Sequence, residues 1–363
     1  MTVYRGASAA AVVAGAVLLL AACTGSARTI TVVSYNVENL FDAEVDGGEY
    51  REFTRHGGWS EDLYTAKLRA IGRALAAADR DGADLVALQE VEHYAAAQRL
   101  VDLELDGLGY RHVVWLPDPH NANGPVVLSK LPVRRVGALW VDSGPAAGAE
   151  EGLERPLRPI LEVEVALGPD GDAPSLFLFN NHWKSKRGGA AETEVYRRRA
   201  AAVLAARIDE ISTADPAAEI LVAGDLNESV DEYERQGRRY ATALMPAAAP
   251  DAAGGLRVTG TVPQARAPVE LYSPWLTHDA DAEPAGSYRY GDDWQTIDHL
   301  LLGPGLFDER GLSYAVGGGF AVIHDGLLDG DGAPRAFYRG PPAGGHSDHL
   351  PLRLELTLHP PSD

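Results

Sequence analysis

The chain has 363 residues, enough for one large domain or two small ones, and its 45% hydrophobic residues exclude an intrinsically disordered protein. Its formal net charge of −20 repels nucleic acid and anionic lipid at long range. A polyanionic substrate would therefore need local basic residues and bound metal to offset that field.

The first 22 residues have the organisation of a secretory signal. Arg5 supplies positive charge, residues 9–20 are apolar, and small residues precede Cys23. This end resembles a bacterial lipobox, which implies cleavage before Cys23 and acylation of its thiol. The alternatives to a lipoprotein signal are an ordinary signal peptide with an incidental cysteine and an uncleaved membrane anchor. The lipobox implies an exported bacterial lipoprotein, held by its lipid anchor at the membrane on the periplasmic or extracellular side.

We divide the chain into a signal peptide (1–22), a tether (23–29) and one folded domain (30–359), since no change of composition marks a second domain. Cys23 is the only cysteine, so the exported domain has no disulfide and depends on its core for stability.

Helical periodicity alternates with short apolar runs along the domain. Ser60 is a helix cap followed by acidic residues, and a second helix is predicted at 193–211. Strands are predicted at 30–37, 84–89, 125–129, 136–141, 160–167, 175–181, 220–224, 296–302 and 352–356. The last of these alternates regularly and is typical of an edge strand. Helices interspersed with many strands indicate an α/β or α+β sandwich, with long surface loops at 246–255 and 317–345.

Polar side chains stand at or just beyond the ends of several of these strands. They are Asn36, Glu90, His182, Asp225, Asn227, Asp298, His299, Asp348 and His349. Carboxylates, carboxamides and imidazoles without cysteine suit a hard divalent cation and a phosphate ester. A folded sheet could bring these groups to one rim.

Six segments carry a family resemblance when they are taken in order: 34–41, 88–92, 181–185, 224–228, 297–300 and 347–349. They resemble the endonuclease/exonuclease/phosphatase superfamily, which includes DNase I and exonuclease III. Within it, the likeness is greatest to bacterial extracellular nucleases. The resemblance implies a DNase I-like four-layer α/β (α+β) sandwich, in which two packed mixed β-sheets are flanked by helices. It also implies metal-assisted, in-line attack of water on phosphorus.

The resemblance further implies a role for each residue of the acid–base group. His349 would accept a proton from the attacking water or orient it, and Asp298 would hold its imidazole in one tautomer. Asp225 and Asn227 would position the nucleophile. His182 would donate to a nonbridging phosphate oxygen.

The remaining residues concern the metal and the substrate phosphate. Glu90, Asn36 and Asp348 would hold Mg²⁺, with Mn²⁺ as an alternative. Arg158 and Lys184 would bind the phosphate. Arg155 competes with Arg158 for this role. Lys186, Arg187 and the arginines at 197–199 are further candidates for a basic track.

Each of these residues also has a plain structural interpretation. Glu90 and Asp225 could be surface acids at strand ends, Asn36 and Asn227 turn residues, and His182 a buried core histidine. The helix arginines could form a solvated charged face. His299 follows Asp298 on a strand and so points to the opposite face, which indicates a structural role.

We expect an exported, Mg²⁺-dependent phosphodiesterase that hydrolyses DNA or RNA. Two alternatives stay open: a phospholipid or phosphosugar phosphoesterase of the same superfamily, and a catalytically inactive binding protein on this fold. Nucleic acid is the expected partner beside the membrane. No protein partner can be inferred, and a monomer is expected.

Overall fold

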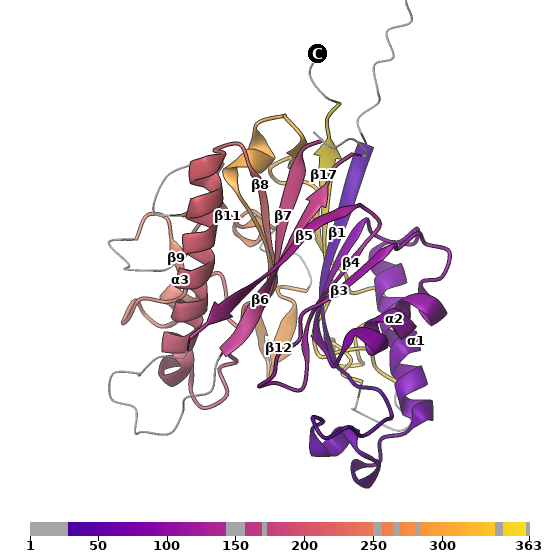
Figure 1. The fold of residues 1–363 in the computed structure, drawn as a ribbon. Coiled ribbons are helices and arrows are strands. Elements are labelled where there is room, and N and C mark those ends of the chain that lie inside the picture. The colour runs from indigo at the N-terminus through magenta and orange to yellow at the C-terminus, as the bar shows by residue number, and fades with distance from the viewer. Residues whose placement is uncertain are drawn as a thin grey trace, which may run out of the picture.

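The structure is a computed structural model that describes residues 28–142, 157–168, 173–249, 256–264, 269–279, 284–337 and 344–360. The predicted signal peptide, Cys23 and Arg155 lie outside these residues. Two mixed β-sheets pack face to face, with helices on both outer sides (Figure 1). The predicted DNase I-like sandwich is confirmed.

The first sheet has the strand order β15–β17–β1–β2–β4–β3, and β16 also pairs with β17. Its strands are β1 (Arg28–Leu40), β2 (Leu85–Val91), β3 (His112–Trp115), β4 (Gly124–Ser129), β15 (Leu312–Ser313), β16 (Phe320–Val322) and β17 (Leu352–Leu358).

The prediction of an edge strand at 352–356 is wrong. β1 pairs with one side of β17 along its whole length, while β16 and β15 pair with the other side. These two partners have three and two residues. They lie at or beside a glycine-rich stretch, and strands this short leave no period-2 pattern that could be recognised.

The second sheet has the strand order β5–β6–β7–β8–β14–β11–β10–β9. Its strands are β5 (Val133–Val141), β6 (Leu157–Ala166), β7 (Ser175–His182), β8 (Glu219–Asp225), β9 (Leu244–Pro246), β10 (Leu256–Thr259), β11 (Glu270–Tyr272) and β14 (Asp298–Leu302). A separate hairpin consists of β12 (Tyr288–Tyr290) and β13 (Asp293–Gln295).

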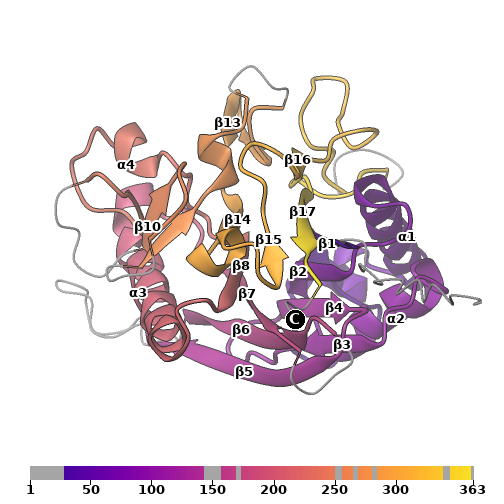
Figure 2. The ribbon, with the colours of Figure 1, turned by 90° about the horizontal axis from the view of Figure 1, so that it is seen from above.

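The helices cover the outer faces of the two sheets. Figure 2 shows α3 (Ala190–Ala214) on one side of the sandwich and α1 (Glu61–Ala78) with α2 (Tyr94–Glu104) on the other. The short α4 (Glu232–Arg235) and the 3₁₀ turns Arg51–Phe53, Arg55–Gly57, Pro274–Leu276 and Pro304–Phe307 complete the helical elements. The predicted cap is confirmed, since Ser60 Oγ accepts a hydrogen bond from the Leu63 N–H. Within the described ranges, no helix has the length and apolarity needed to cross a membrane.

A buried polar contact links the two sheets. Asn180 on β7 donates to the carbonyl oxygens of Leu88 (2.9 Å) and Val126 (2.8 Å), which belong to the other sheet. Its own amide oxygen accepts from Gln89 Nε2 at 2.7 Å. A buried Asn180 amide without hydrogen bonds would destabilise the folded state. The contact therefore favours the alignment of the two sheets in which these hydrogen bonds form.

Strand register explains why the predicted polar residues meet. β7 and β8 run parallel and place His182 beside Asp225, while β14 pairs antiparallel with β8 and places Asp298 on the other side of Asp225. These three residues therefore form one row across neighbouring strands. In the first sheet the register of β1 and β2 shifts after Asn36, and Glu90 has a positive φ of 67°. This bulge turns Glu90 out of the regular alternation of its strand.

The buried carboxyl group of Glu219, at the start of β8, makes the free energy of unfolding depend on pH. Only 5% of the residue is exposed, and one carboxyl oxygen accepts from the Leu312 N–H at 2.8 Å. Burial raises the pKa of Glu219 to about 9 from the ordinary 4.5. Between these values the unfolded chain loses this proton and the folded chain keeps it. The contribution of Glu219 to the free energy of unfolding therefore falls as the pH rises.

Glu219→Gln should remove this dependence, because glutamine keeps the acceptor oxygen and does not ionise. We expect the variant and the wild type to have similar stability at pH 5. At pH 8 the variant should be more stable by about 1–3 kcal/mol. Urea unfolding at both pH values measures the difference, with Glu210→Gln on the exposed face of α3 as control. Equal pH dependence in all three proteins would contradict the assignment.

Candidate active site

A cavity of about 640 Å³ opens where the polar strand ends converge. Its lining combines acids, bases and aromatic rings: Glu90, Arg158, His182, Ser185, Lys186, Arg187, Ala190, Asp225, Asn227, Tyr288, Tyr290, Gln295, Ile297, Asp348 and His349. Most of the predicted site residues line this cavity. Asp298 and Asn36 stand behind it, in hydrogen bonds with lining residues.

His349 and Asp298 form a buried acid–base pair. His349 Nδ1 lies 2.8 Å from Asp298 Oδ2, which also accepts from Ser287 Oγ at 2.6 Å. A carboxylate partner places the proton on Nδ1. Nε2 is then the nitrogen that lies 3.9 Å from Asp225 Oδ2 and 3.9 Å from Asp348 Oδ1. Burial opposes a charged imidazole, but the charge and hydrogen bond of Asp298 raise the pKa of His349 well above 6.5.

Asp225 lies at the centre of the site and is held by two amides. Its Oδ2 accepts from Asn36 Nδ2 and from Asn227 Nδ2, each at 3.1 Å, and its Oδ1 accepts from the Asn227 N–H at 2.8 Å. Burial raises the pKa of Asp225 to about 7. Asn227 has a φ of +51°, which is unfavourable for a residue with a Cβ atom, so the fold holds this amide against local strain.

Glu90 is turned toward the same point by its bulge. Its Oε1 accepts from Asn36 Nδ2 at 3.2 Å and lies 3.5 Å from His182 Nε2. Burial first, and then the neighbouring Asp348, raise the pKa of Glu90. Several carboxyl groups thus lie close together at this point.

Asn36 differs from the expected arrangement. The resemblance implies that its amide oxygen faces a metal ion. In the structure this oxygen accepts from the Glu38 N–H at 3.0 Å, and the amide nitrogen faces Glu90 and Asp225. Asn36 therefore orients the carboxylates as placed, and its oxygen would face them only after the amide group turns over.

The basic residues divide into those that reach the cavity and those that do not. Arg158 lines it and donates from Nη1 to the Trp183 carbonyl at 3.1 Å. Lys184 does not line it: its ammonium lies 3.4 Å from the Ser185 carbonyl oxygen. Lys186 and Arg187 line the cavity instead. Burial, Arg158 and His349 hold the pKa of His182 well below 6.5, so this imidazole is a neutral donor.

Arg197 is not part of a basic track on the surface. Its guanidinium is fully buried and binds Glu228 (2.7 Å) and Glu194 (2.6 Å). The helical position of an arginine does not reveal such partners, because Glu228 belongs to a loop that the fold brings beside the helix. His299 agrees with its predicted structural role, since its Nε2 lies 2.8 Å from the Glu228 carbonyl oxygen.

Sequence reasoning missed three residues that support the acid–base pair. Ser287 binds Asp298, and the ring of Tyr288 packs against the His349 imidazole with 4.8 Å between centroids. Ser347 Oγ donates to the Asn36 carbonyl at 2.8 Å and accepts from the His349 N–H at 3.1 Å. Only Ser347 carried a signal, because it adjoins Asp348 and His349 in the chain.

A second acidic group, Asp42, Glu92 and His93, follows the ends of β1 and β2 and lies outside the cavity. His93 Nδ1 accepts from the Ala96 N–H at 3.0 Å, so Nε2 carries the proton and lies 3.1 Å from Asp42 Oδ2. Both ring nitrogens are thus committed, and this histidine is a poor metal ligand.

A sequence model of the endonuclease/exonuclease/phosphatase family matches residues 31–238. The chain belongs to this family. Endonucleases, exonucleases and phosphatases all cleave phosphate esters, so the endonuclease/exonuclease/phosphatase family is one of phosphoesterases. No curated protein matches the sequence.

Solved structures share the fold of the endonuclease/exonuclease/phosphatase family at low sequence identity. Truncated TDP2 of Caenorhabditis elegans is 16% identical over 91% of this chain and 97% of its own, with a TM-score of 0.51. A mannosyl-6-phosphatase of Bacteroides thetaiotaomicron is 15% identical over 90% and 99%, with a TM-score of 0.51. ANGEL2, a 2′,3′-cyclic phosphatase, is 17% identical over 92% and 96%, with a TM-score of 0.53. At these identities the likeness concerns the fold.

Proposed function

We propose that the protein is a metal-dependent phosphodiesterase that hydrolyses nucleic acid. The observation that carries the proposal is the pair His349–Asp298 facing Asp225 in a cavity that also contains Arg158, Lys186 and Arg187. In a chain of net charge −20, three basic residues at one acidic site indicate a ligand with phosphate groups.

The acid–base pair would activate water. In its neutral form, His349 accepts a proton at Nε2 as the water oxygen bonds to phosphorus, and Asp298 stabilises the resulting imidazolium. The ester bond opposite the water breaks, and its oxygen leaves with the bonding electrons. Asp225 orients the water, and Asn227 keeps Asp225 in place.

The transition state gains charge on its nonbridging oxygens. Arg158 supplies a permanent positive charge beside them. The neutral His182 donates a hydrogen bond without competing for a proton, because its pKa lies well below 6.5. Fixed donors of this kind act most strongly in a buried site.

The residues fit a hard divalent cation. The donors are carboxylates and a carboxamide. Desolvation raises the pKa of Glu90 and of Asp225, and a bound cation would stabilise their ionised forms. Glu90 and Asp348, with Asn36 after its amide turns over, would hold Mg²⁺, which when bound polarises a phosphoryl oxygen and neutralises developing charge.

Hydrolysis of plasmid DNA by residues 24–363 tests the proposal, with Mg²⁺ in one reaction and EDTA in another. Nicking that requires the metal supports a nuclease. Metal-dependent cleavage of bis(p-nitrophenyl) phosphate without cleavage of DNA or RNA would retain the phosphodiesterase and overturn the nuclease. Inactivity on all three substrates would overturn both.

We further propose that acylated Cys23 anchors the protein to a membrane, supported by the lipobox-like sequence before it. Cys23→Ser should shift the full chain from the membrane pellet to the soluble fraction after cell lysis. Two acyl chains bind a bilayer far more firmly than an unmodified tether does. A variant that still sediments with the membranes would indicate an uncleaved apolar segment instead.

A further inference from the structure

The cavity has room for more than the phosphate that is cleaved. Its volume of about 640 Å³ is typical of sites for ligands much larger than one phosphodiester group. The acid–base residues and Arg158 stand at the strand ends. Lys186 and Arg187 come from the loop that follows β7, four and five residues beyond His182. The basic lining residues therefore come from two separate places in the fold.

This loop is fixed in position at both ends. The Lys186 carbonyl accepts from the Gly189 N–H at 2.9 Å, in a turn just before α3. At the other end, buried Arg197 donates to the Lys184 carbonyl at 3.3 Å. These backbone hydrogen bonds on either side of Lys186 therefore help to hold the residue at the cavity wall.

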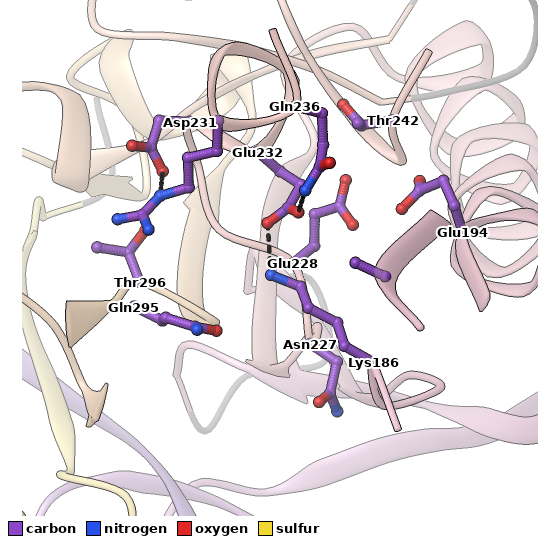
Figure 3. A network of polar contacts seen from close by, with 12 residues as sticks. Lys186, Glu194, Asn227, Glu228, Asp231, Glu232, Gln236, Thr242, Gln295 and Thr296 are labelled. Atoms are coloured by element: carbon purple, nitrogen blue, oxygen red, sulfur yellow. Dashed lines mark hydrogen bonds and ion pairs between the residues drawn. The ribbon is translucent and has the colours of Figure 1, made fainter. Parts of the chain in front are cut away.

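A buried carboxylate fixes the ammonium group of Lys186. Glu232 on α4 is 2% exposed and forms an ion pair with Lys186, while its Oε1 accepts from Gln236 Nε2 at 2.8 Å (Figure 3). Burial opposes ionisation of Glu232, yet the charge of Lys186 lowers its pKa. Within the described part of the chain, the other two N–H groups of Lys186 have no partner, and 23% of its side chain is exposed.

We propose that Lys186 binds a phosphate group adjacent to the one that is cleaved, and that Glu232 sets the strength of this contact. The inference rests on the proposed nuclease function and adds a binding subsite to it, for a second phosphate along the same strand. Glu232 holds Nζ in position and cancels part of its charge, so a flanking phosphate is bound weakly enough for the product to leave. A substrate with a single phosphodiester gains nothing from this contact.

Lys186→Met tests the contact through two substrates of the same chemistry. Thymidylyl-thymidine has one phosphodiester and no flanking phosphate, whereas octathymidylate has several. The ratio of KM for octathymidylate to KM for thymidylyl-thymidine should rise about 5–10-fold, as one lost charge-assisted contact predicts. For octathymidylate, the slope of log kcat/KM against the logarithm of the salt concentration should become shallower by about 0.7.

Glu232→Gln should change KM in the opposite direction. Glutamine keeps the acceptor for Gln236 and removes the charge that offsets Lys186, so KM for octathymidylate should fall about 3-fold. Glu234→Gln is the matched control: it removes the same charge from the same helix, but its partner is Arg238, at 2.7 Å. Glu234→Gln should leave KM within about 1.5-fold of the wild type.

The outcomes separate this inference from the proposed function. An equal rise of both KM values in Lys186→Met would overturn the flanking-phosphate contact, because the loss would then concern the cleaved group or the fold. A rise of KM in Glu232→Gln would overturn the role of Glu232. If the wild type hydrolysed neither substrate, the proposed nuclease would be overturned, and this inference with it.

Discussion

Alanine in place of His349 is expected to lower the kcat of phosphodiester hydrolysis by on the order of 10²–10⁴-fold. The imidazole is held by Asp298 at 2.8 Å, which places Nε2 beside Asp225. The folded structure should persist, since the substitution removes a side chain that borders a cavity. Steady-state kinetics on a chromogenic phosphodiester, with circular dichroism on the same samples, measures both properties.

His346→Ala is the matched control for this experiment. His346 lies in the same segment and is 7% exposed, and its Nδ1 has no hydrogen-bond partner among the described residues. Its backbone carbonyl, which accepts from Lys67 Nζ at 3.0 Å, remains in the variant. We expect activity within about threefold of the wild type. A His349→Ala enzyme with activity as high as this control would remove the general-base assignment.

Glu90→Gln is expected to raise the Mg²⁺ concentration for half-maximal activity by about 100-fold or more. The substitution keeps the shape of the side chain and removes the negative charge that a hard cation requires. A titration of activity with Mg²⁺ measures the shift, and high Mg²⁺ should restore part of the rate.

Glu92→Gln provides the comparison for Glu90. Glu92 is buried, its Oε2 accepts from the Asp42 N–H at 2.8 Å, and the residue does not line the cavity. Its Mg²⁺ titration should match that of the wild type. If Glu90→Gln gave the same titration curve as Glu92→Gln, Glu90 would not be a metal ligand.

The sequence predicted the sandwich and most of the cavity lining because these depend on local patterns. Asp225 and Asp298 adjoin strong apolar runs, so their places at strand ends could be predicted without knowledge of the pairing. Their adjacency depends on β8 and β14 pairing across more than 70 residues, which only the fold and the family resemblance supply.

The errors arose where partners are distant in the sequence. Lys184 and Lys186 are equivalent as sequence, but the fold places Lys186 on the cavity wall and leaves Lys184 beside Ser185. Arg197 resembles any helix-surface arginine until Glu228 is brought beside it. The Asn36 amide could be assigned to the site, but not its orientation, because this depends on a hydrogen bond from Glu38 that the bend at the end of β1 creates.

The direction of β1 bears on which substrates a tethered enzyme could reach. β1 enters the sandwich at Arg28, beside the last strand, and Asn36 lies eight residues further along it, or about 26 Å away. Figure 1 shows this entry at the end of the sandwich opposite the β12–β13 hairpin, which adjoins the cavity. A lipid chain on Cys23 would thus attach the domain by its far end and hold the cavity away from the bilayer. Head groups of the anchoring membrane would be out of reach, whereas dissolved nucleic acid could reach the cavity.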